Sequence, residues 1–513
     1  MANPLWTSRK LRELIEDRLS GVKFIVVSNR EPYIHKHDSN GEIVCIEPAS
    51  GMATAIDPLL RASGGVWVAH GSGSADKETV DINDHVMVPP GEESYTLRRV
   101  WLDQQLEKEY YYGLSNEGLW PLCHIAFQRP IFRLKDWEAY RRANQIFADA
   151  VLEEAGDQSA LVFIQDYHFG LLPRMLKDRN PNLLVAQFWH IPWPNRESFR
   201  VFPWAEELLD GMLGNDLLGF HIRHHCLNFL DTCDRNIESL VDNEHFLVTR
   251  GGHNTMVRPF PISIDFEQHT RDAQSFRVDK EIDNWLKVFE TQPEWIGVGI
   301  DRIDYTKGIP DRLAALDLFL EKHPEFIGRI LFVQIGVPTR EHIGAYTDLS
   351  ASIDAQVEAM NKKWQRNGWH PIHYHKGHCN QDRLMALHRL ANFCLVSSLH
   401  DGMNLVAKEY VASRFDNKGV LILSQFTGSA RELTDALLIN PFSTDDMADA
   451  IYRAICMPVE EQMKRMQRMR EIIEEFNIYR WAGKFLSWLL KFEFPDRREV
   501  EEYKAFASEA SAL

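Results

Sequence analysis

The hydrophobic residues of this chain form short continuous runs that alternate with helix-length amphipathic segments. In the first half the runs lie at 23–28, 66–70, 161–164, 183–189 and 217–220. A second series lies at 296–300, 330–335, 371–375, 393–396, 420–424 and 437–440. Continuous apolar runs of this length are typical of strands buried on both faces, as in parallel sheets. The alternation therefore predicts an α/β protein, and its second series has the six strands of a doubly wound nucleotide-binding domain.

Two prolines, Pro259 and Pro261, interrupt the pattern between the two series. The chain of 513 residues also exceeds the size of one usual hydrophobic core, so two domains are expected. We predict an amphipathic extension over 1–22, an N-terminal domain over 23–265, a second domain over 266–478 and a C-terminal segment over 479–513. The apolar residues of the extension, at helical spacing, predict a short helix that packs on the body, with a partner-binding helix as the alternative.

The charge balance narrows the choice of ligands. A net charge of -17 argues against a general nucleic-acid binder and against a binder of anionic membranes. The seven cysteines are scattered and form no CxxC pair, which fits free thiols in a reducing cytoplasm. The chain has no apolar run of the roughly 18 residues that a membrane helix needs. We therefore expect a cytoplasmic protein that acts on small molecules, and a homo-oligomer is compatible with the sequence.

Polar clusters follow the carboxyl ends of the predicted strands in both halves. Ligands of open α/β sheets bind beyond these ends, so two sheets that face each other would enclose a cleft lined by these groups. Within the clusters, four cations supply the local positive charge that an acidic protein needs to bind phosphates. They are Arg30, Arg302, Lys307 and Arg340.

The stretch 398–410 predicts half of a nucleotide-sugar site. It follows an apolar strand and leads into a helical pattern, with Gly402 at the turn. A helix N-terminus offers unpaired N–H groups and partial positive charge to a phosphate. One turn further, Glu409 is placed to accept hydrogen bonds from paired hydroxyls, as on a ribose. The alternative is an ordinary turn with a surface glutamate.

Three histidines at 221, 224 and 225 have a spacing that could serve a zinc ion. Because no carboxylate or cysteine completes the ligand set convincingly, a structural role is favoured and no metal site is predicted. The aromatic cluster at 110–112 and 119–121 fits either a core or the wall of a ligand site. The chain lacks the G-x-G-x-x-G motif of a dehydrogenase and the G-x-S-x-G motif of a serine hydrolase.

Taken together, six motifs resemble the trehalose-6-phosphate synthase family, whose relatives include the glucosylglycerol-phosphate synthases. The motifs occur in order between about 23 and 492: Ser28-Asn29-Arg30, Leu119-Trp120-Pro121, Asp166-Tyr167-His168, His190-Ile191-Pro192, Arg302 to Gly308 and Asp401 to Tyr410. The resemblance implies two Rossmann-like domains in the GT-B arrangement, with the final helix crossing back to the N-terminal domain. It also implies transfer of glucose from a nucleotide sugar to a sugar phosphate, with retention of configuration and without a metal cofactor. The leading hypothesis is a trehalose-6-phosphate synthase that uses UDP-glucose and glucose 6-phosphate.

The resemblance also assigns roles to residues. Arg302 and Lys307 would hold the donor diphosphate, and His190 and Asp401 would orient the transferred glucose. The remaining donor contacts would come from Gly51, Gly402, Met403, Asn404, Leu405, Val406 and Glu409. The acceptor would be held by Arg30, Tyr111, Trp120, Asp166 and Arg340. The catalytic set is then His190, Arg302, Lys307 and Asp401, with no protein nucleophile.

The chain departs from the family pattern in its N-terminal half and beside the last motif. Gln165 stands where the family usually has histidine, and His400 stands where it usually has arginine; His70 and Ser50 are further departures. The acceptor therefore stays open between glucose 6-phosphate and another phosphorylated compound such as glycerol 3-phosphate. A non-catalytic sugar-phosphate sensor is the alternative from a different functional class. The donor base, UDP, GDP or ADP, is also open.

Overall fold

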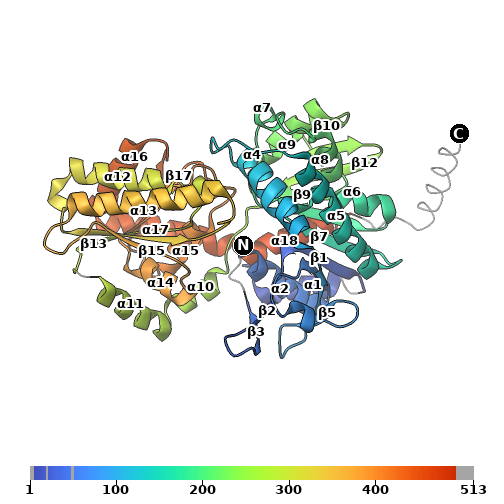
Figure 1. Ribbon diagram of the computed structural model, residues 1–513, viewed down its shortest axis with the longest axis horizontal. Helices are drawn as coiled ribbons and strands as arrows, with labels where there is room; N and C mark the ends of the chain where they lie inside the picture. Colours follow the sequence, from blue (N-terminus) through green and yellow to red (C-terminus); the bar gives the residue numbers. More distant parts are fainter. Residues whose placement is uncertain (1–4, 19–20, 48–50, 290, 493–513) are drawn as a thin grey trace.

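Two separate sheets organise the molecule, and each forms the centre of one lobe in Figure 1. The structure is a computed structural model that describes residues 5–18, 21–47, 51–289 and 291–492, without the side chains of 51–55. The first lobe contains a ten-stranded sheet and the second a six-stranded sheet. A two-stranded hairpin, β2 (Ile34–His37) with β3 (Ile43–Ile46), projects from the first lobe.

The ten-stranded sheet has seven parallel strands with antiparallel strands at its edges. From edge to edge its order is β10 (Leu240–Asp242), β11 (Leu247–Arg250), β12 (His253–Pro259), β9 (Leu217–Phe220), β8 (Leu184–Phe188), β7 (Ala160–Gln165), β1 (Lys23–Arg30), β4 (Val66–His70), β6 (Tyr95–Val100) and β5 (His85–Val88). The pairs β10–β11, β11–β12 and β5–β6 are antiparallel. The strand order changes direction between β1 and β7, so this sheet has its topological switch point there.

The six-stranded sheet is parallel throughout. Its order is β15 (Ile372–Lys376), β14 (Ile330–Val337), β13 (Trp295–Arg302), β16 (Phe393–Val396), β17 (Val420–Ser424) and β18 (Leu437–Ile439). In sequence order this is the 3-2-1-4-5-6 arrangement of a complete Rossmann fold, with its switch point between β13 and β16. The prediction of a doubly wound second half is confirmed.

Helices cover both faces of each sheet because the parallel strands are apolar on both sides. In the second lobe α12, α13 and α16 pack on one face, and α11, α14, α15 and α17 pack on the other (Figure 1). The helices of the first lobe are α1 (Ser8–Arg18), α2 (Gly51–Ser63), α3 (Gln104–Glu107), α4 (Trp120–His124), α5 (Leu134–Ala155), α6 (Leu172–Arg179), α7 (Arg196–Phe199), α8 (Ala205–Met212) and α9 (Arg223–Asn236). Those that follow are α10 (Phe266–Ala273), α11 (Phe276–Val288), α12 (Ile309–Lys322), α13 (Gly344–Trp364), α14 (Gln381–Leu390), α15 (Leu405–Ser413), α16 (Thr444–Cys456), α17 (Val459–Glu475) and α18 (Ile478–Leu489).

The last described helix, α18, leaves the second lobe and packs on the first (Figure 1). Its Trp481 and Phe485 rings contact Phe163 of β7, with centroid separations of 6.3 and 4.4 Å. Leu11 and Ile15 of α1 are buried in the same hydrophobic cluster. The crossing helix and the packing of the amphipathic N-terminal helix on the body are therefore as predicted. The predicted extension and C-terminal segment include Leu19 and residues 493–513, which lie outside the described part.

Two details differ from the sequence-based expectations. β5, β6 and the strands β10 to β12 had no counterpart among the predicted strands, although β6 and β12 each pair in parallel with a strand of the sheet. The sequence also favours a core role for the stripe of Met463, Met466 and Met469. In α17, Met466 and Met469 are buried, but Met463 is 41% exposed. Met463 lies one turn before Met466 on the solvent side of the helix, where a flexible thioether is tolerated.

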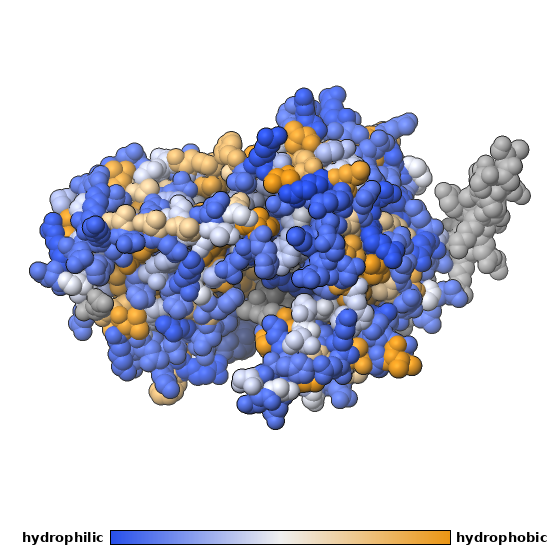
Figure 2. All heavy atoms as spheres, in the orientation of Figure 1, coloured by the Kyte–Doolittle hydropathy of each residue, from blue (hydrophilic) through white to orange (hydrophobic). Residues whose placement is uncertain are grey.

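Over the described ranges, no helix has both the length and the apolar character to cross a bilayer. All seven cysteines are free thiols. Hydrophilic residues dominate the face of the molecule in Figure 2, with hydrophobic residues scattered among them.

Candidate active site

A cavity of about 290 Å³ lies where the two sheets meet, and both switch points open into it. Arg30 ends β1 and Asp166 follows β7, on the two sides of the first switch point. Arg302 ends β13, and Asp401 lies beyond the end of β16, on the two sides of the second. The cavity is lined by Ser28, Asn29, Arg30, Tyr111, Trp120, His124, Gln165, Asp166, Tyr167, His168, His190, Ile191, Arg302, Lys307, Arg340 and Asp401. The predicted cleft between facing sheets is therefore present.

Three guanidinium groups from both lobes converge on one aromatic wall of this cavity. Arg340 lies 4.0 Å from the centroid of the Trp120 ring, and Arg302 lies 5.4 Å from it. Arg30 donates a hydrogen bond of 3.3 Å to the hydroxyl group of Tyr111. Although burial raises the pKa of Tyr111, the guanidinium groups of Arg30 and Arg340 lower it overall. So many fixed cations in one partly closed space fit a dianionic ligand such as a phosphate monoester.

Side chains of the second lobe hold the guanidinium group of Arg340 in place. Its guanidinium donates to Asp304 at 3.2 Å and to the Tyr346 hydroxyl at 2.5 Å. Asp304 is fully buried and also accepts from the backbone and side chain of Thr306. The backbone of Arg340 has φ of 51°, a conformation that few non-glycine residues adopt. Strain of this kind persists where the surroundings hold a residue in place for binding.

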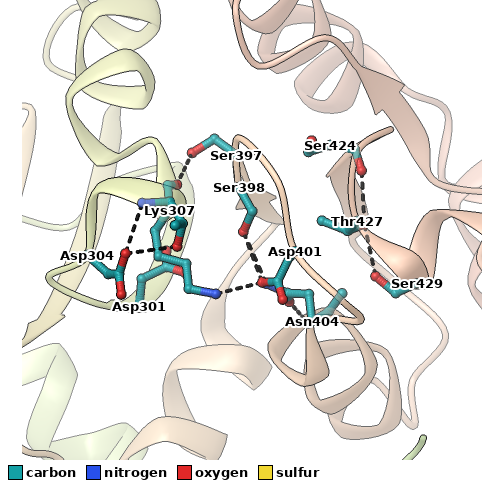
Figure 3. A network of polar contacts seen from close by, with 12 residues as sticks. Asp301, Asp304, Lys307, Ser397, Ser398, Asp401, Asn404, Ser424, Thr427 and Ser429 are labelled. Carbon is teal, nitrogen blue, oxygen red and sulfur yellow. Dashed lines mark hydrogen bonds and ion pairs between the residues drawn. The ribbon is translucent and has the colours of Figure 1, made fainter. Parts of the chain in front are cut away.

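Lys307 and Asp401 form an ion pair at the centre of the second switch point (Figure 3). The Lys307 Nζ to Asp401 Oδ2 distance is 2.6 Å, and Asn404 donates to the same oxygen at 3.2 Å. Burial raises the pKa of Asp401, but the Lys307 ammonium group more than offsets this and holds the pKa well below its usual range. The hydroxyl group of Ser397 donates to the carbonyl groups of Lys307 and Gly308 and so fixes the loop.

Gly402 lies at a close contact between the two lobes beside the site. A Cβ atom at this position would lie 2.5 Å from the carbonyl oxygen of His190 and 2.9 Å from the ring of His221. On its other side, a Cβ atom at Gly428 would lie 2.0 Å from the Gly402 carbonyl oxygen. The glycine is therefore required for a close interlobe contact, because no side chain fits between these backbones.

Three comparisons with known proteins agree on one family. The model of glycosyltransferase family 20 matches residues 22–491. The chain belongs to glycosyltransferase family 20. It is 36% identical to the trehalose-6-phosphate synthase of Mycolicibacterium vanbaalenii, over 93% of this chain and 98% of that protein. It is 33% identical to the UDP-forming alpha,alpha-trehalose-phosphate synthase of Botryotinia fuckeliana, over 92% and 90% of the two chains.

Solved structures of family 20 enzymes show the same fold. An E. coli protein bound with UDP-2-fluoro glucose superposes with a TM-score of 0.81 at 32% identity, covering 92% of this chain and 99% of that one. A UDP-forming alpha,alpha-trehalose-phosphate synthase from Burkholderia xenovorans in complex with glucose-6-phosphate gives a TM-score of 0.80 at 28% identity, covering 91% and 100%. The GT-B arrangement predicted for this family 20 member, with two Rossmann-like domains, is thereby established.

In this family 20 chain, α15 starts at the second switch point, as predicted for a phosphate-binding helix. Asn404 caps it by accepting a 3.0 Å hydrogen bond from the N–H group of Ala407, and its φ is 82°. The N–H groups of Leu405 and Val406 belong to the first turn and have no intrahelical acceptor. Glu409 lies one turn further on, and burial raises its pKa to about 7. Its carboxylate has no hydrogen bond or ion pair within the described residues, and the residue is partly buried rather than fully exposed.

The predicted site residues fall into two groups. Nine line the cavity: Arg30, Tyr111, Trp120, Asp166, His190, Arg302, Lys307, Arg340 and Asp401. The others lie around the turn and helix that follow β16, except Gly51, which begins α2. Residues 48–50 before Gly51 are outside the described part. Met403 is buried in the hydrophobic cluster of the first lobe, so only its backbone is available to a ligand.

The three histidines at the start of α9 do not form a metal site in the described structure. The Nε2 atom of His221 lies 2.9 Å from the carbonyl oxygen of His190. Because a carbonyl oxygen only accepts, His221 is the donor of this hydrogen bond. Burial lowers the pKa values of His221 and His225, while His224 is exposed on the helix surface. Across the described residues, no group of three or more His, Cys, Asp or Glu side chains is placed to hold a metal ion.

The cavity wall also includes residues that sequence reasoning did not place in the site. His124 is one of them. Tyr167 and His168 also line the cavity, and they belong to a motif found in the sequence to which no role was assigned for either residue. His400 donates from Nδ1 to the carbonyl oxygen of His124 at 2.7 Å, which joins the lobes beside the site. The sequence carried a signal for His400 as a departure from the family pattern. It carried none for His124, a single histidine in a short helix.

Proposed function

We propose that the protein is a retaining glucosyltransferase that transfers glucose from UDP-glucose to glucose 6-phosphate and forms trehalose 6-phosphate. The observation that carries this proposal is the single cavity between two switch points, in which Arg30, Arg302 and Arg340 surround one aromatic wall. Membership in family 20 and the printed activities of its relatives support the choice of substrates. The co-substrate is a nucleotide sugar, and the reaction as proposed uses no metal. We further propose that the protein works in the cytoplasm.

On the donor side, we assign the diphosphate to Arg302, Lys307 and the N-terminal turn of α15. The backbone N–H groups of Leu405 and Val406 and the helix dipole favour negative charge there. Glu409 would accept hydrogen bonds from the ribose hydroxyls, and Asp401 with His190 would orient the glucose. The ion pair with Lys307 keeps Asp401 ionised before the donor binds.

On the acceptor side, we assign the phosphate to Arg30, Tyr111, Trp120 and Arg340. Each charge-assisted hydrogen bond contributes about 1.5–3 kcal/mol, so a dianion held by several of them binds tightly despite the net negative charge of the protein. Asp166 also lines the cavity, where it would contact the acceptor sugar. Burial raises the pKa of Asp166 to about 7, so its carboxyl group can donate as well as accept near neutral pH.

In this arrangement catalysis rests on positioning and on electrostatic stabilisation. The acceptor hydroxyl attacks the anomeric carbon on the face from which the diphosphate departs, and the leaving phosphate takes the acceptor proton. Negative charge grows on the leaving diphosphate, and the cations of Arg302 and Lys307 stabilise it. Holding donor and acceptor in one cavity lowers the entropic barrier of the bimolecular step. No protein nucleophile is required.

The test is an assay of nucleoside diphosphate release with UDP-, GDP- and ADP-glucose, each combined with glucose 6-phosphate or glycerol 3-phosphate. We expect the fastest release with UDP-glucose and glucose 6-phosphate. Release with glycerol 3-phosphate alone would instead favour the glucosylglycerol-phosphate synthase alternative. That alternative is kept because Gln165 and His400 depart from the family pattern. Absence of release with every sugar nucleotide would leave the sensor alternative.

The raised pKa of Glu409 predicts that donor binding weakens in acid. Ribose hydroxyls donate to the ionised carboxylate, so the KM for the donor should rise as the pH falls through about 7 and should level off above it. Donor KM is measured between about pH 6 and pH 8 at saturating acceptor, which suppresses the titration of Asp166. In Glu409→Gln the donor KM should lose this dependence and stay near the value that the wild type has at the acid end of the range. An unchanged pH dependence in that variant would exclude Glu409 from the donor site.

A further inference from the structure

Gln165 occupies the end of β7 and contacts the site histidine directly. Its side chain is 1% exposed and lines the cavity. Its Oε1 atom lies 3.0 Å from Nε2 of His190. Its Nε2 atom is buried and has no hydrogen-bond partner among the described residues. An unpaired buried amide costs about 1–3 kcal/mol, and such costs are retained mainly where a ligand completes the hydrogen bonding.

His190 is fixed at three points by its neighbours. Its backbone N–H donates to Asp166 Oδ1 at 3.1 Å, and its carbonyl oxygen accepts from His221 at 2.9 Å. The hydrogen bond between Gln165 and Nε2 fixes the orientation of the imidazole ring. Burial lowers the pKa of His190 well below its usual value, and the nearby rings of His221 and His168 lower it further. The imidazole is therefore neutral, with one nitrogen as donor and the other as acceptor.

The amide of Gln165 decides which nitrogen carries the proton. A carbonyl oxygen only accepts, so its contact with Nε2 requires the proton to be on Nε2 and leaves Nδ1 with a free lone pair. We propose that Gln165 is a positioning residue that holds His190 in the Nε2-protonated tautomer, so that Nδ1 accepts a hydrogen bond from a hydroxyl group of the transferred sugar. The unpaired Gln165 amide then donates to an oxygen of the same ligand. The second part rests on the proposed function, whereas the tautomer is a property of the free protein.

A glutamine at this position has a chemical consequence. Unlike histidine or glutamate, it does not titrate, so the His190 ring keeps the same partner at every pH. A glutamate would also accept from Nε2, but its negative charge would favour protonation of Nδ1 and remove the acceptor. A methionine of similar length would provide neither the acceptor nor the donor. Comparing glutamine, glutamate and methionine at this position therefore separates the effect of the side chain on the His190 tautomer from its role as a donor to the ligand.

The direct test is the ¹⁵N NMR spectrum of the histidine rings in the free protein, with the His190 signals assigned by their loss in His190→Ala. We expect the wild-type ring to be neutral and protonated on Nε2. In Gln165→Met the two tautomers should mix, and in Gln165→Glu the ring should shift toward the doubly protonated form. A wild-type ring protonated on Nδ1 would overturn the proposal, because the amide would then face the ring through its nitrogen.

Kinetics supply the second readout. Gln165→Met should lower kcat/KM for the donor about tenfold, the loss of roughly one hydrogen bond, with a smaller change in the acceptor KM. Gln187→Met is the matched control: Gln187 is a buried glutamine on β8 whose amide donates to the Asp166 and Phe169 carbonyl groups and does not contact the His190 ring. This control should lower thermal stability while leaving the His190 tautomer unchanged.

The outcomes separate the two proposals. Wild-type tautomer and kinetics in Gln165→Met would overturn the role of Gln165 even if the enzyme makes trehalose 6-phosphate. Loss of the Nε2 tautomer in Gln187→Met as well would show that any buried glutamine affects the ring, and would also overturn it. If no sugar nucleotide supports turnover, the proposed function fails, and the NMR spectra still decide whether Gln165 fixes His190.

Discussion

Gly402→Ala should reduce kcat/KM at least about a hundredfold while leaving the folding stability of each lobe nearly unchanged. The new methyl group would lie 2.5 Å from the His190 carbonyl oxygen, a backbone atom that a rotamer change cannot move. The lobes must then separate, which displaces Asp401 and Lys307 from the groups of the first lobe. A displacement of about 1 Å is sufficient for a loss of this size, because the reaction depends on holding two substrates in register.

Gly344→Ala is the matched control for this substitution. Gly344 begins α13 in the same lobe, and a methyl group added there would meet no other atom within 4 Å. Its backbone conformation is one that alanine adopts without strain. The variant should retain wild-type kcat/KM and thermal stability. Wild-type activity in Gly402→Ala would show that the close approach of the lobes at this point is not needed for the reaction.

Arg340→Ala should raise the KM for the sugar-phosphate acceptor about a hundredfold and should change the donor KM only slightly. The substitution removes a guanidinium group that we assign to the acceptor phosphate, and charge-assisted hydrogen bonds of about 1.5–3 kcal/mol account for a change of this size. Arg340→Lys should be intermediate, because an ammonium group keeps the charge but not the stacking on Trp120 or the planar fork. Steady-state kinetics with each substrate varied in turn measure the KM for the acceptor and the KM for the donor separately.

Two controls separate binding from stability in this experiment. Arg340→Ala leaves the buried carboxylate of Asp304 without its ion pair, so thermal unfolding is measured in parallel. Arg329→Ala removes an exposed arginine of the same lobe, paired with Glu294, and should leave both KM values unchanged. Equal increases in donor and acceptor KM in folded Arg340→Ala would remove Arg340 from the acceptor site.

The central parallel strands could be predicted from the sequence because each is buried on both faces and forms a continuous apolar run. β6 lacked this signal. Arg99 in this strand is fully buried, where its charge is balanced by Glu31 and Asp76 at 2.9 Å each. A buried ion network with partners far apart in the sequence has no hydrophobic pattern, so β6 was missed. The boundary near residue 265 remains a prediction.

The candidate site could be predicted because ligands of open α/β sheets bind beyond the carboxyl ends of the strands. Arg30, Asp166, Arg302 and Asp401 lie beyond strands at the switch points, and the fold alone brings them together. Glu409 was anticipated from its helical position, but its partial burial and its unpaired carboxylate follow from packing that no local pattern encodes. The same is true of Gln165, which the sequence marked only as a departure. Its contact with His190 depends on the register of β7 and β8.

The most direct test of the account is the structure of the product formed from UDP-glucose and glucose 6-phosphate. The account predicts a disaccharide phosphate in which the two anomeric carbons share one oxygen. The transferred glucose has the α configuration because the donor leaves and the acceptor attacks on the same face, and the acceptor carbon has the α configuration of the anomer that reacts. NMR spectroscopy of the purified product determines the linkage and both configurations. A β configuration at the transferred glucose, or release of free glucose without a new glycosidic bond, would contradict it.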